Sequence, residues 1–362
     1  MSTSLPRPAL PARARAFALL VLTLAIALGG PTAASAAPSA AAVSAEVALA
    51  LEAAVARADR AVGTLGMAVA VVADDGRTWV GSHGIDEGGR RIDAAAPFVI
   101  GSVTKTFTAA LVMALVDEGR IALDAPVATY LPNVRMARGV TVRQLLTHTS
   151  GIADLYGSRK WHLHNRPHQA LTSNDVLFSI GARWFAPGTG YAYSNTNYFL
   201  LGHIIEAVSH RTFAEELERR FTGPMGLENT RLLGPESPLL PAAWSTGFWT
   251  SGAMQSTPLE LASWGRNLFG GHALSYPSTR RMVTDKSGTR YGHGTQLFRI
   301  AGRDLPGHSG LLYSTTTLMV HLPAERVTVV LTGPQPGVDL ESALAGQYGG
   351  PSLLEVARQL AG

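Results

Sequence analysis

The sequence predicts an α+β fold in which an antiparallel sheet is flanked by N-terminal and C-terminal helices and encloses an inserted, mainly helical domain. Strand-forming residues gather in two regions, 66–81 and 291–331, at opposite ends of the chain. Strand signals are scarce between them, in residues 123–243. We therefore expect a discontinuous α/β domain made of residues 37–122 and 244–362, and a helical domain made of 123–243.

The N-terminal part of the predicted α/β domain consists of a helix and a strand hairpin. Residues 43–62 combine helix formers with spaced apolar side chains, which predicts a helix. The continuous apolar run 66–73 predicts a buried strand. An Asp-Asp-Gly turn then leads into a second strand at 77–81.

The middle of the chain favours helices. A helical segment opens near Asp124 and is broken at Pro132, and residues 141–146 predict a short helix. Two longer helices are expected at 173–182 and 197–209, the second with apolar residues at helical spacing.

The C-terminal part returns to strands after one helix. Residues 257–260 fit a capping box with proline at the first helical position. Three strand-forming runs follow, at 291–300, 307–321 and 326–331. We expect them to form an antiparallel sheet with the two N-terminal strands, covered by a terminal helix at 339–360 that a Gly-Gly-Pro sequence interrupts.

Length and composition set bounds on the chemistry. The chain has 362 residues, of which 46% are hydrophobic and 15% charged, which is typical of a globular protein with sizeable cores. It has no cysteine, so disulfides, thiolate metal sites and cysteine nucleophiles are excluded. Any covalent catalysis must therefore use an oxygen or nitrogen nucleophile.

The first 36 residues have the pattern of a secretory signal peptide. Three arginines precede the apolar run 16–28, which is too short to cross a bilayer, and a small-residue cleavage pattern ends at Ala36. We expect cleavage near Ala36, a mature chain without a membrane span, and a secreted, extracellular or cell-envelope-associated protein. Loss of the three arginines lowers the formal net charge from +4 to about +1, which argues against a nucleic-acid partner.

The candidate nucleophile is Ser102, which precedes Lys105 by three residues at the start of a strongly helical run that ends at Gly119. Residues three apart share one face of a helix, so the hydroxyl and the amine are expected to lie together. The N-terminus of a helix also stabilises negative charge. Alone, the Ser-x-x-Lys pattern is weak and is far more typical of a capped surface helix than of a nucleophile.

Two further polar motifs lie downstream. Tyr193-Ser194-Asn195 occupies a turn before a helix, where a phenol and a carboxamide could overhang a cleft. His308-Ser309-Gly310 lies inside a strand-forming run, where glycine lets a substrate backbone approach the sheet edge.

Together, in this order, the three motifs resemble those of the penicillin-recognising serine hydrolases, in the branch that holds serine D-Ala-D-Ala carboxypeptidases, class C β-lactamases and related esterases. The resemblance covers residues 63–332, with supporting stretches at 145–151 and 252–261. It implies a β-lactamase/transpeptidase-like fold. Compared with the related S-x-x-K, S-D-N, K-T-G set, tyrosine replaces serine in the second motif and histidine replaces lysine in the third. Residues 311–314 lack the further glycine common after the third motif.

The resemblance implies how the acyl group is transferred. Ser102 attacks a carbonyl carbon, and Lys105 and Tyr193 share the removal of its proton and the later activation of water. Which of the two is the general base stays open. The backbone N–H groups of Ser102 and Leu311 form the oxyanion hole.

The resemblance also implies how substrate is held. Asn195 binds the substrate amide, His308 and Ser309 meet its carboxylate, and Gly310 also belongs to the substrate-binding residues. Because the charge of a histidine depends on pH, we expect carboxylate-bearing substrates to bind better below about pH 6.5.

We therefore expect a secreted serine hydrolase that works through an acyl-enzyme on Ser102 and resembles a D-alanyl-D-alanine carboxypeptidase or a β-lactamase, with a serine esterase as the alternative. The expected substrates are a small peptide of the peptidoglycan stem, a β-lactam or an ester. We expect a monomer that needs no cofactor and no metal.

Other interpretations stay open at this stage. A non-catalytic penicillin-binding sensor would be acylated without turnover, and His162, His164 and His168 could converge on zinc in a metal hydrolase. His148 and Asp154 are interpreted as structural turn residues.

Overall fold

The structure is a computed structural model, and it describes residues 43–157 and 166–361. The predicted signal peptide, residues 1–36, lies outside the described residues. Among the described residues, no helix is both long and apolar enough to span a membrane.

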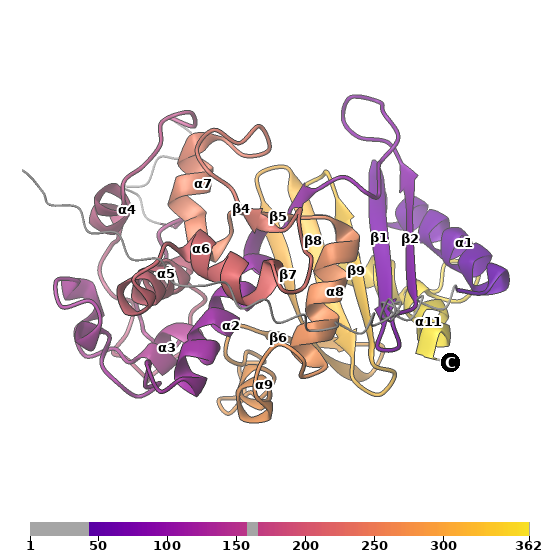
Figure 1. Cartoon of the computed structure of the whole chain (residues 1–362). Coiled ribbons are helices and arrows are strands. Elements are labelled where there is room, and N and C mark those ends of the chain that lie inside the picture. The colour runs from indigo at the N-terminus through magenta and orange to yellow at the C-terminus, as the bar shows by residue number, and fades with distance from the viewer. Residues whose placement is uncertain (1–42, 158–165, 362) are drawn as a thin grey trace, which may run out of the picture. The chain divides into compact units, whose positions relative to one another are not determined.

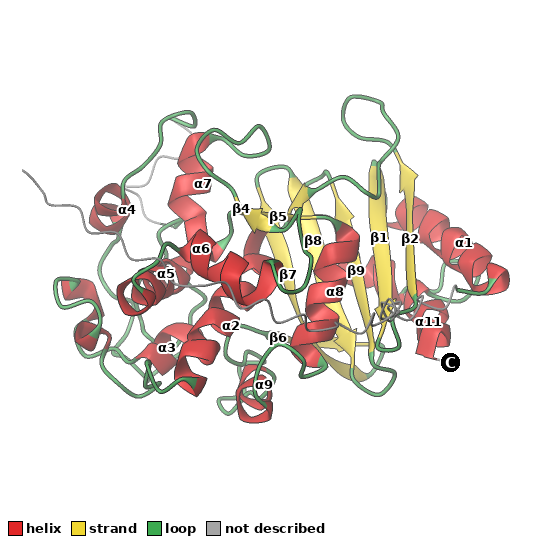
Figure 2. Ribbon diagram, viewed as in Figure 1, coloured by secondary structure: helices red, strands yellow, loops and turns green. Residues whose placement is uncertain are grey.

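The strands of the main sheet come from both ends of the chain, as predicted. Within the described residues, six antiparallel strands follow the order β2-β1-β9-β8-β7-β6 (Figures 1 and 2). Their bounds are β1 Gly66–Ala73, β2 Thr78–Gly84, β6 Gln296–Ile300, β7 Arg303–Leu312, β8 Thr315–Leu322 and β9 Val327–Gly333. The prediction of an antiparallel sheet completed by the N-terminal strands is confirmed.

Helices cover both faces of this sheet. On one face α1 (Ala45–Val62) contacts α10 (Leu340–Ala345) and α11 (Leu353–Ala357), so the two ends of the described chain lie side by side (Figure 1). On the other face α8 (Pro258–Phe269) contacts β1, β8 and β9. All eight residues of β1 are buried, because both faces of the strand are covered, and this explains its continuous apolar sequence.

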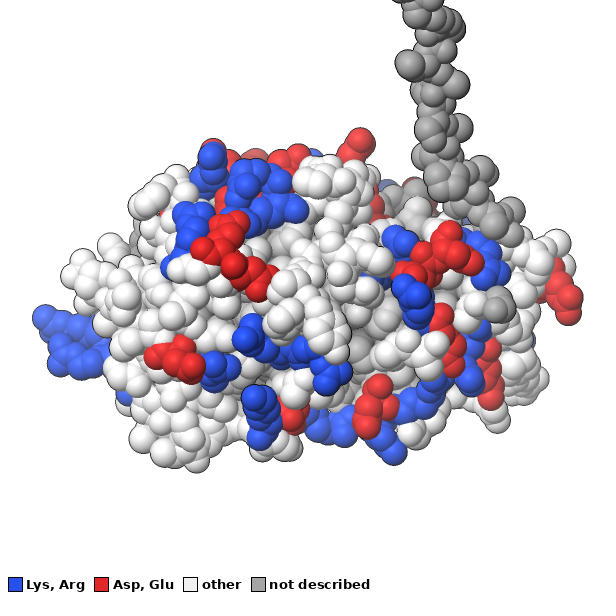
Figure 3. Space-filling model, turned by 60° about the horizontal axis from the view of Figure 1, so that its bottom comes forward, with Lys and Arg blue, Asp and Glu red and all other residues white. Residues whose placement is uncertain are grey.

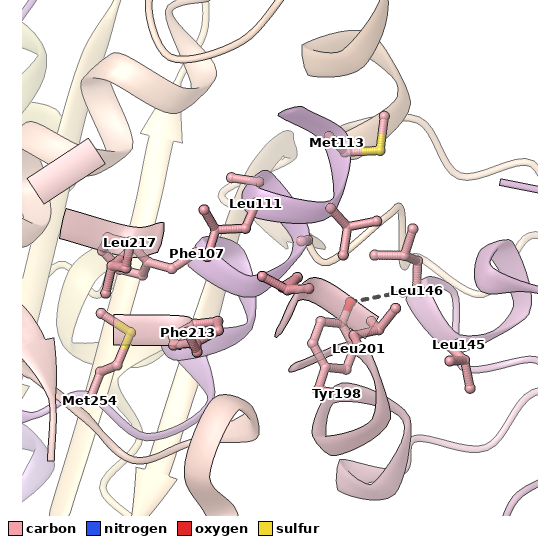
Figure 4. Packing of buried hydrophobic residues seen from close by; sticks show 14 of the residues in the cluster. Phe107, Leu111, Met113, Leu145, Leu146, Tyr198, Leu201, Phe213, Leu217 and Met254 are labelled. Carbon is pink, nitrogen blue, oxygen red and sulfur yellow. Dashed lines mark hydrogen bonds between the residues drawn. The ribbon is translucent and has the colours of Figure 1, made fainter. Parts of the chain in front are cut away.

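The helical part of the chain packs around α2 (Thr104–Asp117). Figure 4 shows side chains of α2 among residues of α3 (Val142–Leu146) and α5 (Asn195–Ser209), with the Tyr198 hydroxyl donating to the Leu146 carbonyl at 2.8 Å. The remaining helices are α4 Ser173–Ser179, α6 Phe213–Leu217, α7 Ala242–Phe248 and α9 Tyr276–Met282. The same hydrophobic cluster includes sheet residues such as Met319, so one core joins the helices to the sheet. The predicted domain boundaries near 123 and 243 stay a prediction.

Several elements differ from the sequence-based expectation. The run 307–321 is two strands joined by a two-residue turn, in which Tyr313 has a φ of 56°. The helix expected from Asp124 is reduced to a single 3-10 turn at Val127–Thr129. A small sheet in the order β3-β5-β4 is additional, and its strands are β3 Phe98–Val99, β4 Arg231–Leu232 and β5 Met254–Ser256.

Charged side chains of both signs lie next to one another on the face shown in Figure 3. Ion pairs between the two signs occur in the structure, for example Arg303 with Glu325 at 2.7 Å. The mixture on this face fits the low net charge expected for the mature chain.

Candidate active site

Ser102 lies in a short 3-10 turn, Gly101–Val103, that leads directly into α2. The helical spacing predicted for the first motif is present, and Lys105 Nζ lies 2.9 Å from Ser102 Oγ. The turn packs against β7 so closely that a Cβ atom added to Gly101 would lie 2.8 Å from the Leu311 nitrogen. The candidate nucleophile is therefore fixed between a helix N-terminus and a strand edge.

Lys105 is completely buried, and each of its ammonium hydrogens has an acceptor. Besides Ser102 Oγ, Nζ donates to Asn195 Oδ1 at 2.7 Å and to the Ser251 carbonyl at 2.6 Å. Burial lowers the pKa of Lys105 to about 7, with the Asp154 carboxylate acting in the opposite direction. When the amine is neutral, two N–H bonds still reach Asn195 and Ser251, so its lone pair faces the Ser102 hydroxyl.

Tyr193 lies close to both Ser102 and Lys105. Its ring centroid lies 4.9 Å from Lys105 Nζ. Burial raises the pKa of Tyr193 well above its usual value of 10, although a hydrogen bond with Ser102 acts in the opposite direction. The phenol is therefore protonated at neutral pH, and Lys105 is the group of the two that is partly in its basic, deprotonated form there.

Asn195 begins α5 and is held from two sides. Its backbone N–H donates to Asp154 Oδ1 at 2.8 Å and its Nδ2 donates to Asp154 Oδ2 at 3.3 Å, while Oδ1 accepts from Lys105. One amide hydrogen stays available for the substrate contact that the resemblance implies. The sequence led us to interpret Asp154 as a turn residue, but the structure connects it to the site through Asn195. The signal in the sequence that could have indicated this role is its position just after the stretch 145–151.

His148 packs against the second motif and accepts a hydrogen bond from it. The residue is buried with a φ of 56°, and its Nδ1 accepts the backbone N–H of Ser194 at 3.1 Å. Its ring lies 4.2 Å from that of Tyr193, between centroids. Burial and the neighbouring Lys105 hold the pKa of His148 well below 6.5, so the imidazole is neutral. This fits the structural role predicted for it.

The third motif lies on the part of β7 that extends beyond β6, whose ladder with β7 ends at the pair Gln296 and Gly307. The Ser309 N–H and hydroxyl both donate to Gln296 Oε1, at 2.7 and 2.9 Å, so this N–H points away from β8. N–H directions alternate along a strand, and that of Leu311 therefore points to the same edge. A Cβ atom on Gly310 would lie 2.0 Å from the Ile100 carbonyl oxygen and 3.2 Å from the Ser102 nitrogen. Only glycine allows the two backbones to approach in this way.

His308 corrects the sequence-based expectation about pH. The side chain is buried, its Nδ1 lies 2.6 Å from the Ser309 carbonyl oxygen, and its Nε2 lies 3.0 Å from the Tyr291 hydroxyl. Burial, with a smaller contribution from Lys105, lowers the pKa of His308 to about 3. The expected gain of charge near pH 6.5 is therefore wrong for the protein without substrate, because the neutral ring has a partner at each nitrogen.

Of the three histidines considered for zinc, His162 and His164 lie outside the described residues, and His168 is exposed. Within 43–157 and 166–361, no group of three histidine, aspartate or glutamate side chains is placed to hold a metal ion.

Several known proteins are similar to this chain in sequence and in fold. The chain is 34% identical over 148 residues to penicillin-binding protein 4* of Bacillus subtilis, covering 38% of this chain and 32% of that protein. It is 25% identical over 270 residues to the D-alanyl-D-alanine-carboxypeptidase/endopeptidase AmpH of Escherichia coli K12, covering 69% of this chain and 68% of that one. The chain thus spans only about a third of the first of these relatives.

A solved structure extends the likeness to nearly the whole fold. The D-stereospecific amidohydrolase from a Streptomyces species superposes with a TM-score of 0.70 at 27% identity, covering 84% of this chain and 99% of that one. Residues 51–343, most of the chain, match the family described as Beta-lactamase. The chain therefore belongs to the Beta-lactamase family.

Proposed function

We propose that this hydrolase forms an acyl-enzyme on Ser102 and cleaves D-alanyl-D-alanine peptides or β-lactams. The contact of Ser102 Oγ with Lys105 Nζ carries the proposal, since a buried amine with a pKa of about 7 is a base suited to neutral pH. The names of AmpH and of the Streptomyces amidohydrolase support D-configured peptide and amide substrates.

Acylation begins with attack of Ser102 Oγ on the carbonyl carbon of the substrate. The hydroxyl proton moves to the neutral Lys105 Nζ, and the carbonyl oxygen becomes an oxyanion. This oxyanion accepts hydrogen bonds from the backbone N–H groups of Ser102 and Leu311. The bond from carbon to the leaving nitrogen then breaks, and the Tyr193 hydroxyl donates its proton to that nitrogen. Lys105 reprotonates Tyr193 within the pair.

Deacylation reverses these proton movements. A water molecule attacks the ester carbonyl, and its proton passes to the neutral Lys105 Nζ as the second tetrahedral intermediate forms. The bond between Ser102 Oγ and the carbonyl carbon breaks, and the serine regains its proton. The products are the free acid and the resting enzyme.

An esterase is the second candidate, and His308 favours it. A neutral, buried imidazole provides no fixed positive charge for a terminal carboxylate. An ester substrate has no such group to bind. We also propose export of the protein, on the pattern of its first 36 residues.

One panel of substrates tests the proposal. Wild type and Ser102→Ala are assayed with a D-Ala-D-Ala peptide, nitrocefin and p-nitrophenyl acetate, and intact mass is measured after incubation with benzylpenicillin. We expect turnover of at least one substrate and a covalent adduct, both absent in Ser102→Ala. Full activity of the alanine variant would refute the proposal, and an adduct without any turnover would indicate a sensor.

A further inference from the structure

A cavity, which we call the α9 cavity, lies between the end of α8, the helix α9 and the strands β6, β7 and β8. In Figure 1, α9 lies next to the lower end of α8. The cavity has a volume of about 520 Å³, which is within the range of small-molecule sites in proteins. Leu297 of β6 and Pro306 of β7, which pair with each other across the sheet, both line it. No residue of the three sequence motifs does so, and the cavity is therefore separate from the candidate active site.

The walls of the α9 cavity are mainly apolar and contain several rings. Phe269 and the exposed Tyr276 contribute aromatic side chains. The Phe269 ring also contacts that of His321, with 5.8 Å between centroids. Pro306 and Pro323 add further apolar surface. Such walls favour an aromatic ligand, because a flat ring buries much apolar area and pairs with other rings at this spacing.

Two polar side chains of the wall are buried and lack a partner. The His321 side chain is 3% exposed, and its Nδ1 lies 3.0 Å from Thr328 Oγ1, whereas its Nε2 has no hydrogen-bond partner within 43–157 and 166–361. Thr279 Oγ1 is likewise buried with no partner in the part of the chain that the structure describes. Burial lowers the pKa of His321 to about 4, so its ring is neutral at pH 7. An unpaired buried polar group is costly, and a polar atom of a ligand would provide the missing partner.

Arg280 supplies a positive charge at the mouth of the cavity. Its side chain is exposed, and its guanidinium forms no ion pair or hydrogen bond with any described residue. The other charged residues of the wall are already engaged. Arg290 binds Asp304 at 2.9 Å, and Asp285 accepts the backbone N–H of Arg290 at 2.6 Å. A free guanidinium matches the geometry of a carboxylate, to which it donates two parallel hydrogen bonds.

We propose that the α9 cavity binds an aromatic carboxylic acid that has a second polar group at the end opposite the carboxylate. The carboxylate binds Arg280 at the mouth, the ring system packs on Phe269, and the second polar group meets His321 Nε2 inside. This inference is independent of the proposed function, because none of these residues takes part in the reaction at Ser102.

Calorimetric titration with two naphthalene compounds tests the charge. The anionic 2-naphthoate and the neutral 2-naphthamide are compared on wild type, Arg280→Gln and Arg281→Gln. Arg281 is the matched control, because it is the next residue of α9, is also exposed and does not line the cavity.

We expect 2-naphthoate to bind wild type and the control at least about fivefold more tightly than 2-naphthamide does, and this preference to disappear in Arg280→Gln. Equal affinities of the two compounds for wild type, or no binding of either, would overturn the site. An unchanged preference in Arg280→Gln, or an equal loss in Arg281→Gln, would also overturn it.

NMR locates the ligand and tests the contact with His321. We expect nuclear Overhauser effects from the naphthalene protons to the methyl groups of Val283 and Leu297, which both line the cavity. The hydroxyl of 6-hydroxy-2-naphthoate lies at the end opposite its carboxylate. We therefore expect this compound to shift the His321 Nε2 resonance more than 2-naphthoate does, and to bind at least about threefold more tightly.

Two outcomes of the NMR experiment would overturn the site: Overhauser effects confined to residues outside the α9 cavity, or a hydroxyl group that changes neither the affinity nor the His321 resonance. None of these measurements uses turnover. A protein that binds 2-naphthoate as expected but hydrolyses no substrate would therefore refute only the proposed function.

Discussion

Asp154 holds Asn195 by both its backbone and its side chain, with Oδ1 2.8 Å from the backbone nitrogen and Oδ2 3.3 Å from Nδ2. Because Asn195 in turn accepts a hydrogen bond from Lys105, the carboxylate orients the amine through one intermediate residue. Its negative charge also raises the pKa of Lys105 against the effect of burial. Asp154 is therefore a positioning residue.

Removing this charge is expected to shift the pH dependence of the enzyme. In Asp154→Asn the pKa of Lys105 falls below about 7, so the rising limb of kcat/KM against pH moves to lower pH. Lost orientation of Asn195 lowers kcat at the plateau by about tenfold. The control is Glu87→Gln, an exposed carboxylate in a loop. A lower kcat with the rising limb of kcat/KM at the same pH as in wild type would contradict the predicted effect of the Asp154 charge on the pKa of Lys105.

The pKa of Lys105 predicts how kcat/KM of the wild-type protein depends on pH. The neutral amine is the proposed base, so kcat/KM rises with pH through about 7 and falls tenfold per pH unit below it. Lys105→Arg keeps the charge but cannot lose its proton, so we expect a loss of about a thousandfold without this limb. Steady-state rates from pH 5 to pH 9 measure both. A wild-type profile that is flat through pH 7 would contradict the assignment.

Gly310 tests the close approach of β7 to the Ser102 turn. In Gly310→Ala the new Cβ would lie 2.0 Å from the Ile100 carbonyl oxygen, so the turn or the strand must move. We expect kcat/KM to fall by at least about a hundredfold, and overpacking to lower the free energy of unfolding by about 1–3 kcal/mol. Gly181→Ala, where no atom lies within 4 Å of the new Cβ, is the control. Thermal unfolding and ester hydrolysis measure the two effects, and activity near wild type would contradict the geometry.

His308 is expected to stay neutral through the range in which histidines usually titrate. Its pKa of about 3 means that no proton is gained between pH 8 and pH 5, so KM for a D-Ala-D-Ala peptide stays constant there if the pKa is unchanged by binding. The ring carbon chemical shifts of His308, followed by NMR against pH, measure the titration directly. A midpoint for His308 between pH 5 and pH 8 would contradict the prediction.

The sequence predicts most closely those elements whose burial pattern is continuous. The strand expected at 66–73 has these bounds in the structure, because it begins at a glycine, Gly66, and an Asp-Asp-Gly turn follows it. The hairpin of β7 and β8 was interpreted as one run, since Tyr313 adopts a positive φ in a turn that has no glycine or asparagine. Strands of two residues, such as β3, are too short to show a period.

The sequence likewise predicts some contacts of the candidate site and does not predict others. Helical spacing is enough to bring Ser102 and Lys105 together, since both lie within one turn. The contact of Asp154 with Asn195 joins residues 41 positions apart, so no local pattern predicts it. The neutrality of His308 depends on burial and on the Tyr291 hydroxyl, which a motif does not reveal.

The burial of Lys105 has a consequence for the stability of the whole protein. In the unfolded chain its amine has an ordinary pKa of 10.5, whereas in the folded protein the pKa is about 7. Between these values the unfolded chain binds more protons, so the contribution of Lys105 to the free energy of unfolding rises with pH there and is least favourable below pH 7. Folding thus expels a proton from Lys105. The lowered pKa of Lys105 therefore reduces the free energy of unfolding at neutral pH. The same shift places a partly neutral amine beside Ser102, which an unfolded chain would not provide.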